Sequence, residues 1–196
     1  DFFKYRYLPE VAEFDKHPGL RVLEVGVGLG TDILQFAKNG ANVYGIDLTS
    51  NAIDMTSRRF QQAGLEGSFQ QASFTGIPFK DGSFDVVYCF GVLHHSEETQ
   101  QGIDEIHRIL KPGGRVIALL YHKGFTYYVR TLFRHGVLKG EYLRSSTQAI
   151  LNRHTEEFGN SPLTKAYSRR DARAMFKEFE LLSLECYRLG DDIPFM

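Results

Sequence analysis

Residues 22–30 read VLEVGVGLG, an apolar run that ends in glycines at every second position. A glycine turn between a strand and a helix lets the backbone approach a ligand and opens the helix N-terminus to it. Thr31 stands where the dinucleotide-binding pattern GxGxxG has its last glycine, and Glu24 precedes the first glycine by two positions. A carboxylate there repels a pyrophosphate, so the stretch favours a ligand without phosphate. The alternative is a tight turn that binds nothing.

Short apolar runs alternate with helical patterns on both sides of this stretch. Strands are predicted at 21–25, 42–46, 67–71, 84–90, 115–121 and 181–187, and helices at 31–38, 51–63 and 97–110. The central runs are apolar throughout, which is typical of parallel strands covered on both faces. The pattern predicts an α/β fold with a doubly wound, mostly parallel sheet.

The alternation of predicted strands and helices ends after residue 121. One apolar helix face is predicted by Phe125, Tyr128, Val129, Leu132 and Phe133. Further helices are expected over 145–157 and from Ser168, whose hydroxyl suits a capping-box start with Asp171. We interpret the chain as a single domain. Its parts are an N-terminal cap segment (1–19), a cofactor-binding core (20–121), a helical insertion (122–167) and a final helix and strand (168–196).

Length and composition narrow the class of protein. The 196 residues are enough for one domain with a real core, and the net charge of −1 gives no broad attraction to nucleic acid. Cys89 and Cys186 lie far apart, so neither a disulfide framework nor a zinc motif is indicated, and a reducing, cytoplasmic setting is expected. Neither a signal peptide nor an apolar run as long as a membrane span is evident. The sequence does not predict an oligomeric state.

A second acid narrows the ligand further. Asp47 closes the predicted strand 42–46, at the usual place for a carboxylate that binds ribose hydroxyls. Its alternative role is that of a turn or helix-start residue. S-adenosylmethionine has a ribose and an ammonium group and lacks phosphate. It therefore suits both Asp47 and Glu24.

Four motifs in order resemble one known family. VLEVGVGLGTD, YGIDLT, IPFKDGSFDVVYCFGVLHH and EIHRILKPGG, within residues 20–121, are similar to class I S-adenosylmethionine-dependent methyltransferases. The nearest group contains ubiquinone and menaquinone biosynthesis enzymes and many small-molecule methyltransferases. The resemblance implies a Rossmann-like seven-stranded sheet with a reversed last strand, and S-adenosylmethionine as the cofactor, converted to S-adenosylhomocysteine.

The resemblance also implies cofactor contacts. The methionine end is expected at Glu24, Gly26, Gly28 and Gly30, the ribose at Asp47 and the adenine against Leu48. The family's acid near the adenine amino group is replaced by Ser73, followed by Phe74, which suits stacking near the base. Cys89 and Phe90 are expected beside the transferred methyl group.

Catalysis requires alignment, desolvation and, for some acceptors, a proton acceptor, because methyl transfer is an in-line displacement. The candidate bases are His94, His95 and His122, which follow predicted strands. The alternative is that these histidines cap helices or pack structurally. No metal is required in principle, and no cluster of ligand spacing is evident in the sequence.

Aromatic residues supply candidate contacts at both ends of the core. Tyr5 and Arg6 in the N-terminal segment are candidates for binding the methionine carboxylate, or they belong to an aromatic helix packed on the sheet. The candidate acceptor-binding residues are Tyr7, Tyr121, Tyr127, Tyr128 and Tyr167. The insertion holds seven basic against three acidic residues, which suits an acidic or membrane-associated acceptor or simply a solvated face.

The leading expectation is methyl transfer from S-adenosylmethionine to an oxygen, nitrogen or carbon atom of a small organic acceptor. A non-catalytic cofactor-binding module of the same fold is one alternative. An RNA methyltransferase is another, although the N/D-P-P-Y/F and Pro-Cys motifs of many nucleic-acid methylases are absent. A nicotinamide dehydrogenase is disfavoured by Glu24 and the GxGxG spacing.

Overall fold

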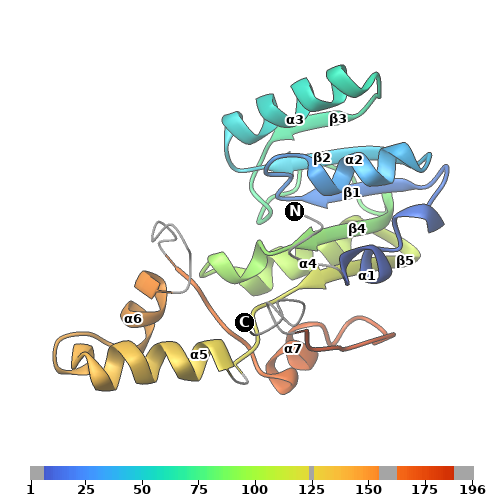
Figure 1. The fold of residues 1–196 in the computed structure, drawn as a ribbon. Helices are drawn as coiled ribbons and strands as arrows, with labels where there is room; N and C mark the ends of the chain where they lie inside the picture. The colour runs from blue at the N-terminus through green and yellow to red at the C-terminus, as the bar shows by residue number, and fades with distance from the viewer. Residues whose placement is uncertain (1–6, 124–125, 155–162, 188–196) are drawn as a thin grey trace. The chain divides into compact units, whose positions relative to one another are not determined.

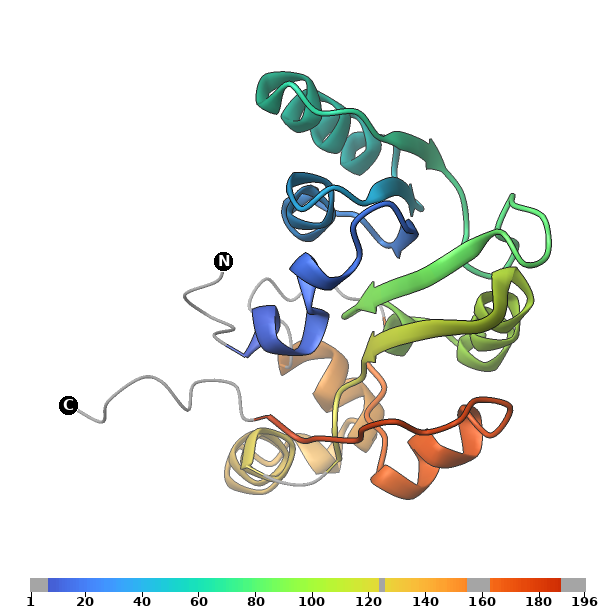
Figure 2. The same cartoon turned by 90° about the vertical axis from the view of Figure 1, so that its right-hand side faces the viewer.

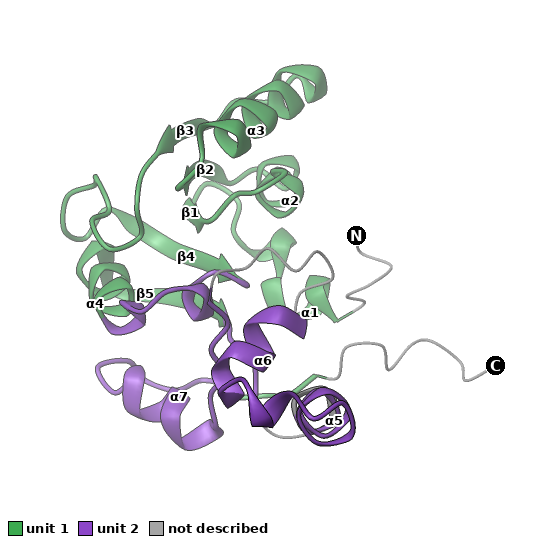
Figure 3. Ribbon diagram, turned by 90° about the vertical axis from the view of Figure 1, so that its left-hand side faces the viewer, with its two compact units in different colours: residues 1–90, 101–118, 183–196 green, residues 91–100, 119–182 purple. Residues whose placement is uncertain are grey.

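The computed structural model describes residues 7–123, 126–154 and 163–187 (Figure 1). These residues form two compact units, shown in different colours in Figure 3. Unit 1 contains the described parts of 1–90, 101–118 and 183–196, and unit 2 those of 91–100 and 119–182. Every described helix is too short or too polar to cross a lipid bilayer.

A five-stranded sheet is the centre of unit 1 (Figure 2). The strands are β1 (Arg21–Val25), β2 (Asn42–Asp47), β3 (Ser68–Gln71), β4 (Phe84–Phe90) and β5 (Leu110–Leu119), in the order β3-β2-β1-β4-β5. β1 pairs in parallel with β2 and β4, and β2 pairs in parallel with β3. The carboxyl ends of these strands therefore meet at one edge. The predicted α/β fold class is confirmed.

Helices cover both faces of the sheet. One face carries α1 (Leu8–Ala12), α2 (Thr31–Lys38) and α3 (Ser50–Ala63), and the other carries α4 (Thr99–Ile109) (Figure 3). A short 3-10 turn, η1 (Phe14–Lys16), joins α1 to the sheet. On the first face Phe14, Phe36 and Tyr88 pack edge to face or tilted, as aromatic rings prefer. Both faces of the central strands are buried, which explains their uninterrupted apolar sequence.

Local sequence accounts for the helix boundaries of unit 1. Thr49 caps α3 by accepting a hydrogen bond from the backbone amide of Ala52 at 3.3 Å, and Gly64 ends it in a left-handed conformation. The N-cap residue of α2 is instead Gly30, which has no side chain to cap the helix. The missing cap is supplied from the sheet, as described below.

Unit 2 contains short helices and a strap. The helical elements are η2 (Leu93–His95), α5 (Thr126–Thr131), the π-helix η3 (Leu132–Leu138), η4 (Glu141–Leu143), α6 (Thr147–His154) and α7 (Arg169–Met175). The strap, residues 163–167, pairs with residues 121–123. The backbone amide of Tyr167 donates to the carbonyl of Tyr121 at 2.7 Å, and the amide of Lys123 donates to the carbonyl of Tyr167 at 2.9 Å. Ser168 and Asp171 begin α7 with the predicted capping box.

One expectation from the sequence is wrong. Residues 181–187 form no strand; Leu181 and Leu182 are exposed, and the described residues form five of the six predicted strands. Residues 126–138 are helical as predicted, in α5 and η3, although Val129 and Phe133 of the apolar stripe are more than half exposed. η3 turns more slowly than an α-helix, so an α-helical spacing does not identify its buried side.

Candidate functional site

The glycine turn follows β1, and its glycines have different roles. Gly26, Gly28 and Gly30 all have positive φ, at 80°, 50° and 69°. A methyl group at Gly28 would meet no other atom within 4 Å, whereas one at Gly30 would lie 2.8 Å from the Thr56 side chain. Gly28 therefore leaves room for a ligand beside the backbone, and Gly30 allows α2 to pack against α3.

Glu24 lies under this turn, at the end of β1. It is 4% exposed, and its Oε2 accepts a hydrogen bond of 3.0 Å from the backbone amide of Ile33 in the first turn of α2. This bond supplies the cap that Gly30 cannot. Burial raises the pKa of Glu24 well above its ordinary value, and the nearby charges of Asp32 and Asp47 raise it further.

Asp32, for which no role was predicted, completes an acidic cluster. It stands in the first turn of α2, and the Tyr88 hydroxyl of β4 donates to its Oδ2 at 2.9 Å. Burial raises the pKa of Asp32, and the bond from Tyr88 lowers it in part. Asp32 could have been predicted from its place in the motif VLEVGVGLGTD, where it is the last residue and follows the glycine turn. We call Glu24, Asp32 and Asp47 the acidic cluster.

Asp47 ends β2 beside the glycine turn. Its Oδ2 accepts from the backbone amide of Gly28 at 3.1 Å, and its Oδ1 accepts from the amide and hydroxyl of Thr49 at 2.9 Å each. A carboxylate offers about four acceptor sites, so one site remains for a ligand. Leu48, which follows, is 71% exposed and presents a bare apolar surface.

The remaining cofactor candidates lie near the ends of β3 and β4. The Ser73 hydroxyl is bonded to Thr75 Oγ1 at 2.8 Å and accepts from the Thr75 amide at 3.2 Å, and Phe74 is half-buried. Cys89 is fully buried, whereas Phe90 is half-buried and stacked on Tyr88 at 6.1 Å. Tyr5 and Arg6 lie outside the described residues.

The three candidate histidines lie in unit 2 and differ in their surroundings. His94 is fully buried and stacked 3.9 Å from Tyr121; burial and the neighbouring His95 lower its pKa to about 3. His94 is therefore neutral at physiological pH. His122 is exposed and forms a backbone bridge with Tyr167.

His95 has a defined tautomer. Its Nδ1 lies 3.0 Å from the backbone carbonyl of Leu163 in the strap, and a carbonyl only accepts. Nδ1 therefore carries the hydrogen, and in the neutral ring Nε2 carries the lone pair. This is the arrangement that a proton acceptor needs.

The candidate acceptor-binding tyrosines are distributed over the two units. Tyr7 is stacked on Tyr187 at 4.1 Å within unit 1, and Tyr121 lies against His94 in unit 2. The side chains of Tyr127 and Tyr128 lie outside the described residues. The Tyr167 hydroxyl is 2.9 Å from Thr99 Oγ1.

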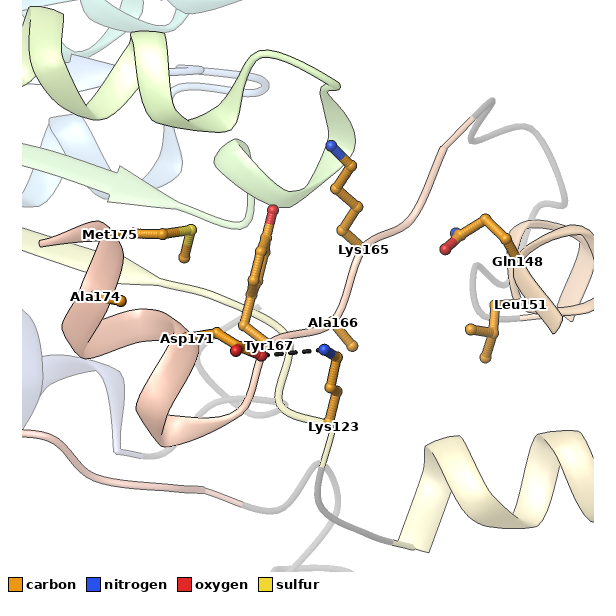
Figure 4. Close-up of a pocket in the computed structure, with 9 residues that line it drawn as sticks. All are labelled: Lys123, Gln148, Leu151, Lys165, Ala166, Tyr167, Asp171, Ala174 and Met175. Atoms are coloured by element: carbon orange, nitrogen blue, oxygen red, sulfur yellow. Dashed lines mark hydrogen bonds and ion pairs between the residues drawn. The ribbon is translucent and has the colours of Figure 1, made fainter.

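Tyr167 also lines a pocket of about 460 Å³ in unit 2 (Figure 4). Its walls come from the strap, the segment 121–123 that pairs with it, α6 and α7: Lys123, Gln148, Leu151, Lys165, Ala166, Tyr167, Asp171, Ala174 and Met175. Lys123 is paired with Asp171 at 3.0 Å, and Lys165 with Glu97 at 3.0 Å. The pocket thus combines an aromatic wall, a thioether and two neutralised lysines.

The residues at the glycine turn fit S-adenosylmethionine. The acidic cluster suits a cationic ligand, Gly28 leaves open space, and Leu48 offers an apolar surface beside the carboxylate of Asp47. An acid at the carboxyl end of the second strand suits a ribose. A doubly wound sheet with this glycine turn defines a class of nucleoside-binding proteins.

Comparison with known proteins identifies the family. Residues 23–118 match the family described as Methyltransferase domain. This match identifies residues 23–118 as a methyltransferase domain of the class I S-adenosylmethionine-dependent type, as the four motifs predicted.

Relatives share this core over part of their length. The uncharacterized methyltransferase YcgJ of Bacillus subtilis is 34% identical in sequence, over 50% of this chain and 39% of the relative. The crystal structure of YcgJ superposes with a TM-score of 0.68, over 89% of this chain and 67% of that chain. The demethylmenaquinone methyltransferase of Clavibacter sepedonicus is 31% identical, over 70% of this chain and 62% of the relative. The solved structure of the cyclase SpnF is 30% identical, over 57% of this chain and 43% of that chain, with a TM-score of 0.54. The chain thus spans less than two thirds of these curated relatives.

Proposed function

We propose that this protein is an enzyme that binds S-adenosylmethionine and methylates a small organic acceptor. The observation that carries the proposal is the acidic cluster under the glycine turn. Burial and mutual repulsion raise the pKa of Glu24, so a bound cation relieves this repulsion and a phosphate increases it. The ammonium and sulfonium groups of S-adenosylmethionine provide that positive charge.

Each residue of the turn has a part in this binding. Glu24 and Asp32 attract the amino-acid end, and Gly28 lets the backbone approach it. Asp47 accepts from the ribose at its remaining acceptor site, with Leu48 against the adenine. Ser73 and Phe74 complete the adenine surroundings, and Cys89 and Phe90 border the reacting centre.

When bound, S-adenosylmethionine supplies an electrophilic methyl group. The protein's task is to orient the acceptor and, for a hydroxyl acceptor, to remove its proton. We assign this proton to Nε2 of His95, which follows β4 in the chain and whose tautomer is held by Leu163. His94 is a poor base because its pKa is lowered to about 3. The pocket beside Tyr167 is the candidate acceptor surface.

A second function has one observation in its favour. SpnF, which shares 30% identity with this chain, is described as a cyclase, so a similar core serves another reaction there. In that case this chain holds the cofactor without transferring its methyl group. The two functions differ in the release of S-adenosylhomocysteine.

Calorimetry with S-adenosylmethionine and S-adenosylhomocysteine tests the binding step. We expect both to bind, and Asp47→Ala to weaken binding by about 1.5–3 kcal/mol because a charge-assisted hydrogen bond is lost. Asp47→Asn keeps one carbonyl acceptor and serves as the matched control with a smaller loss. Failure of both ligands to bind the folded protein excludes the proposal.

A homocysteine-release screen tests methyl transfer. Phenolic quinone precursors come first because one relative is named a demethylmenaquinone methyltransferase, followed by amines and RNA. Cofactor binding without turnover of any acceptor favours the second function. We also propose a cytoplasmic location, which the low cysteine content supports.

A further inference from the structure

Unit 2 contains a cluster of two histidines and a glutamate that the methyltransferase site does not use. His135 lies in η3, Glu141 begins η4 and His154 ends α6. One nitrogen of each histidine and one carboxylate oxygen all lie within 4.8 Å of one another. The three side chains are only 17–21% exposed.

Packing between η3 and η4 brings these side chains together. Gly136 follows His135, and a methyl group there would overlap the ring of Tyr142. The glycine thus lets η4 lie directly on the π-helix, with Glu141 Oε1 3.5 Å from Nδ1 of His135. π-helical turns occur frequently at functional sites. Oε1 is also 2.9 Å from Nε2 of His154.

The contacts leave one nitrogen unsatisfied. Nδ1 of His135 is buried and lies beyond ordinary hydrogen-bond distance of Glu141. The two imidazole rings are stacked 3.6 Å apart. A neutral imidazole has a lone pair to offer a metal ion. The cluster thus holds two nitrogen ligands and one carboxylate in a partly dry site.

We propose that His135, Glu141 and His154 bind a divalent transition-metal ion such as zinc. Two imidazoles and one carboxylate form a typical zinc ligand set, with one position left for water. Ligand atoms of a tetrahedral zinc ion are about 3.3 Å apart, as bond lengths near 2.0–2.1 Å require. The observed separations of 2.9 and 3.5 Å lie on either side of this value.

Two adjustments accompany binding. The stacked rings must turn apart so that both lone pairs converge on one ion. Arg153, which pairs with Glu141 Oε2 at 2.8 Å, is more than half exposed and can remain on that oxygen or move into water. The ion then bonds Oε1, which both histidines already face.

Titration of the metal-free chain with zinc sulfate, followed by calorimetry, tests the site. We expect one ion per chain and at least about tenfold weaker binding in both His135→Ala and His154→Ala, since even indirect contacts to a ligand are worth that much. Binding weakens at lower pH because both imidazoles must be neutral. Zinc is expected to shift the ring signals of both histidines in NMR spectra.

Matched variants keep the outcome decisive. His107→Ala removes an exposed histidine of α4 and is expected to leave zinc binding unchanged. Glu141→Gln retains the shape of the side chain and is expected to weaken zinc binding. It takes the place of the alanine variants if those fail to fold. The proposal is overturned if the folded wild-type chain binds no zinc, or if His107→Ala weakens binding as much as the cluster variants.

Discussion

The glycine turn of unit 1 and the strap of unit 2, with the residues that it contacts, are built in different ways. The acidic cluster comes from residues 24–47, a short stretch in which each acid lies near the end of a strand or in the first turn of a helix. The strap joins residues 68 positions apart, through His95 to Leu163 and through Thr99 to Tyr167. A site made from consecutive strands and helices can be recognised as a sequence motif. A site made by contacts between distant segments cannot.

Burial also has opposite electrostatic consequences in the two regions. It raises the pKa of Glu24 and lowers that of His94, so both groups favour their neutral forms. Glu24 shares its surroundings with two other acids, so a cationic ligand restores its charge. His94 faces the ring of Tyr121 and stays neutral. The comparison therefore predicts a ligand-dependent charge in unit 1 and a fixed neutral ring in unit 2.

The largest expected effect concerns His95. His95→Asn preserves a donor near the position of Nδ1 for the Leu163 carbonyl and removes the proton acceptor at Nε2. With a hydroxyl acceptor we expect kcat to fall about 100- to 10,000-fold, the usual contribution of a general base. The thermal midpoint serves as the control and should change little. Wild-type kcat in this variant would show that His95 only holds the strap.

The next effect separates two glycines of the turn. Gly30→Ala is expected to lower the free energy of unfolding by about 2–5 kcal/mol, because the left-handed conformation costs about 1–2 kcal/mol and the contact with buried Thr56 about 1–3 more. Gly28→Ala meets no atom and serves as the control, with a loss of only about 1–2 kcal/mol. Urea denaturation measures both. Equal losses would contradict the different roles assigned to these glycines.

The smallest effect tests the charge of Glu24. Glu24→Gln should weaken S-adenosylmethionine binding about 10- to 100-fold, the worth of a charge-assisted contact, without lowering stability at neutral pH. In the wild type the raised pKa means that the folded state holds the proton more tightly. The contribution of Glu24 to the free energy of unfolding should therefore be greatest below pH 4.5 and fall as pH rises from there through the raised pKa, a slope that Glu24→Gln should lack.

Cofactor affinity should show the opposite trend. It rises with pH across the same window, because the ionised carboxylate binds the cation. Calorimetry over a pH series measures this slope, and Glu24→Gln should flatten it. A wild-type slope that persists in the variant would assign the titration to Asp32 instead.

Much of unit 1 was predictable because its signals are local. The helix 31–38 and the strands 21–25 and 84–90 were predicted with their observed bounds, as was the capping box at Ser168 in unit 2. Apolar runs, glycine spacing and capping residues act over a few positions. The family followed from the same short motifs.

The sequence by itself determined the parallel core, the glycine turn and the family, because each depends on neighbours within a few residues. Only the tertiary structure decided that Tyr88 reaches Asp32, that Leu163 holds His95 and that His135 meets His154. It also decided that residues 181–187 form no strand, since a strand needs a partner and not only an apolar pattern. Contacts between distant segments depend on how whole elements pack, and no local spacing encodes that.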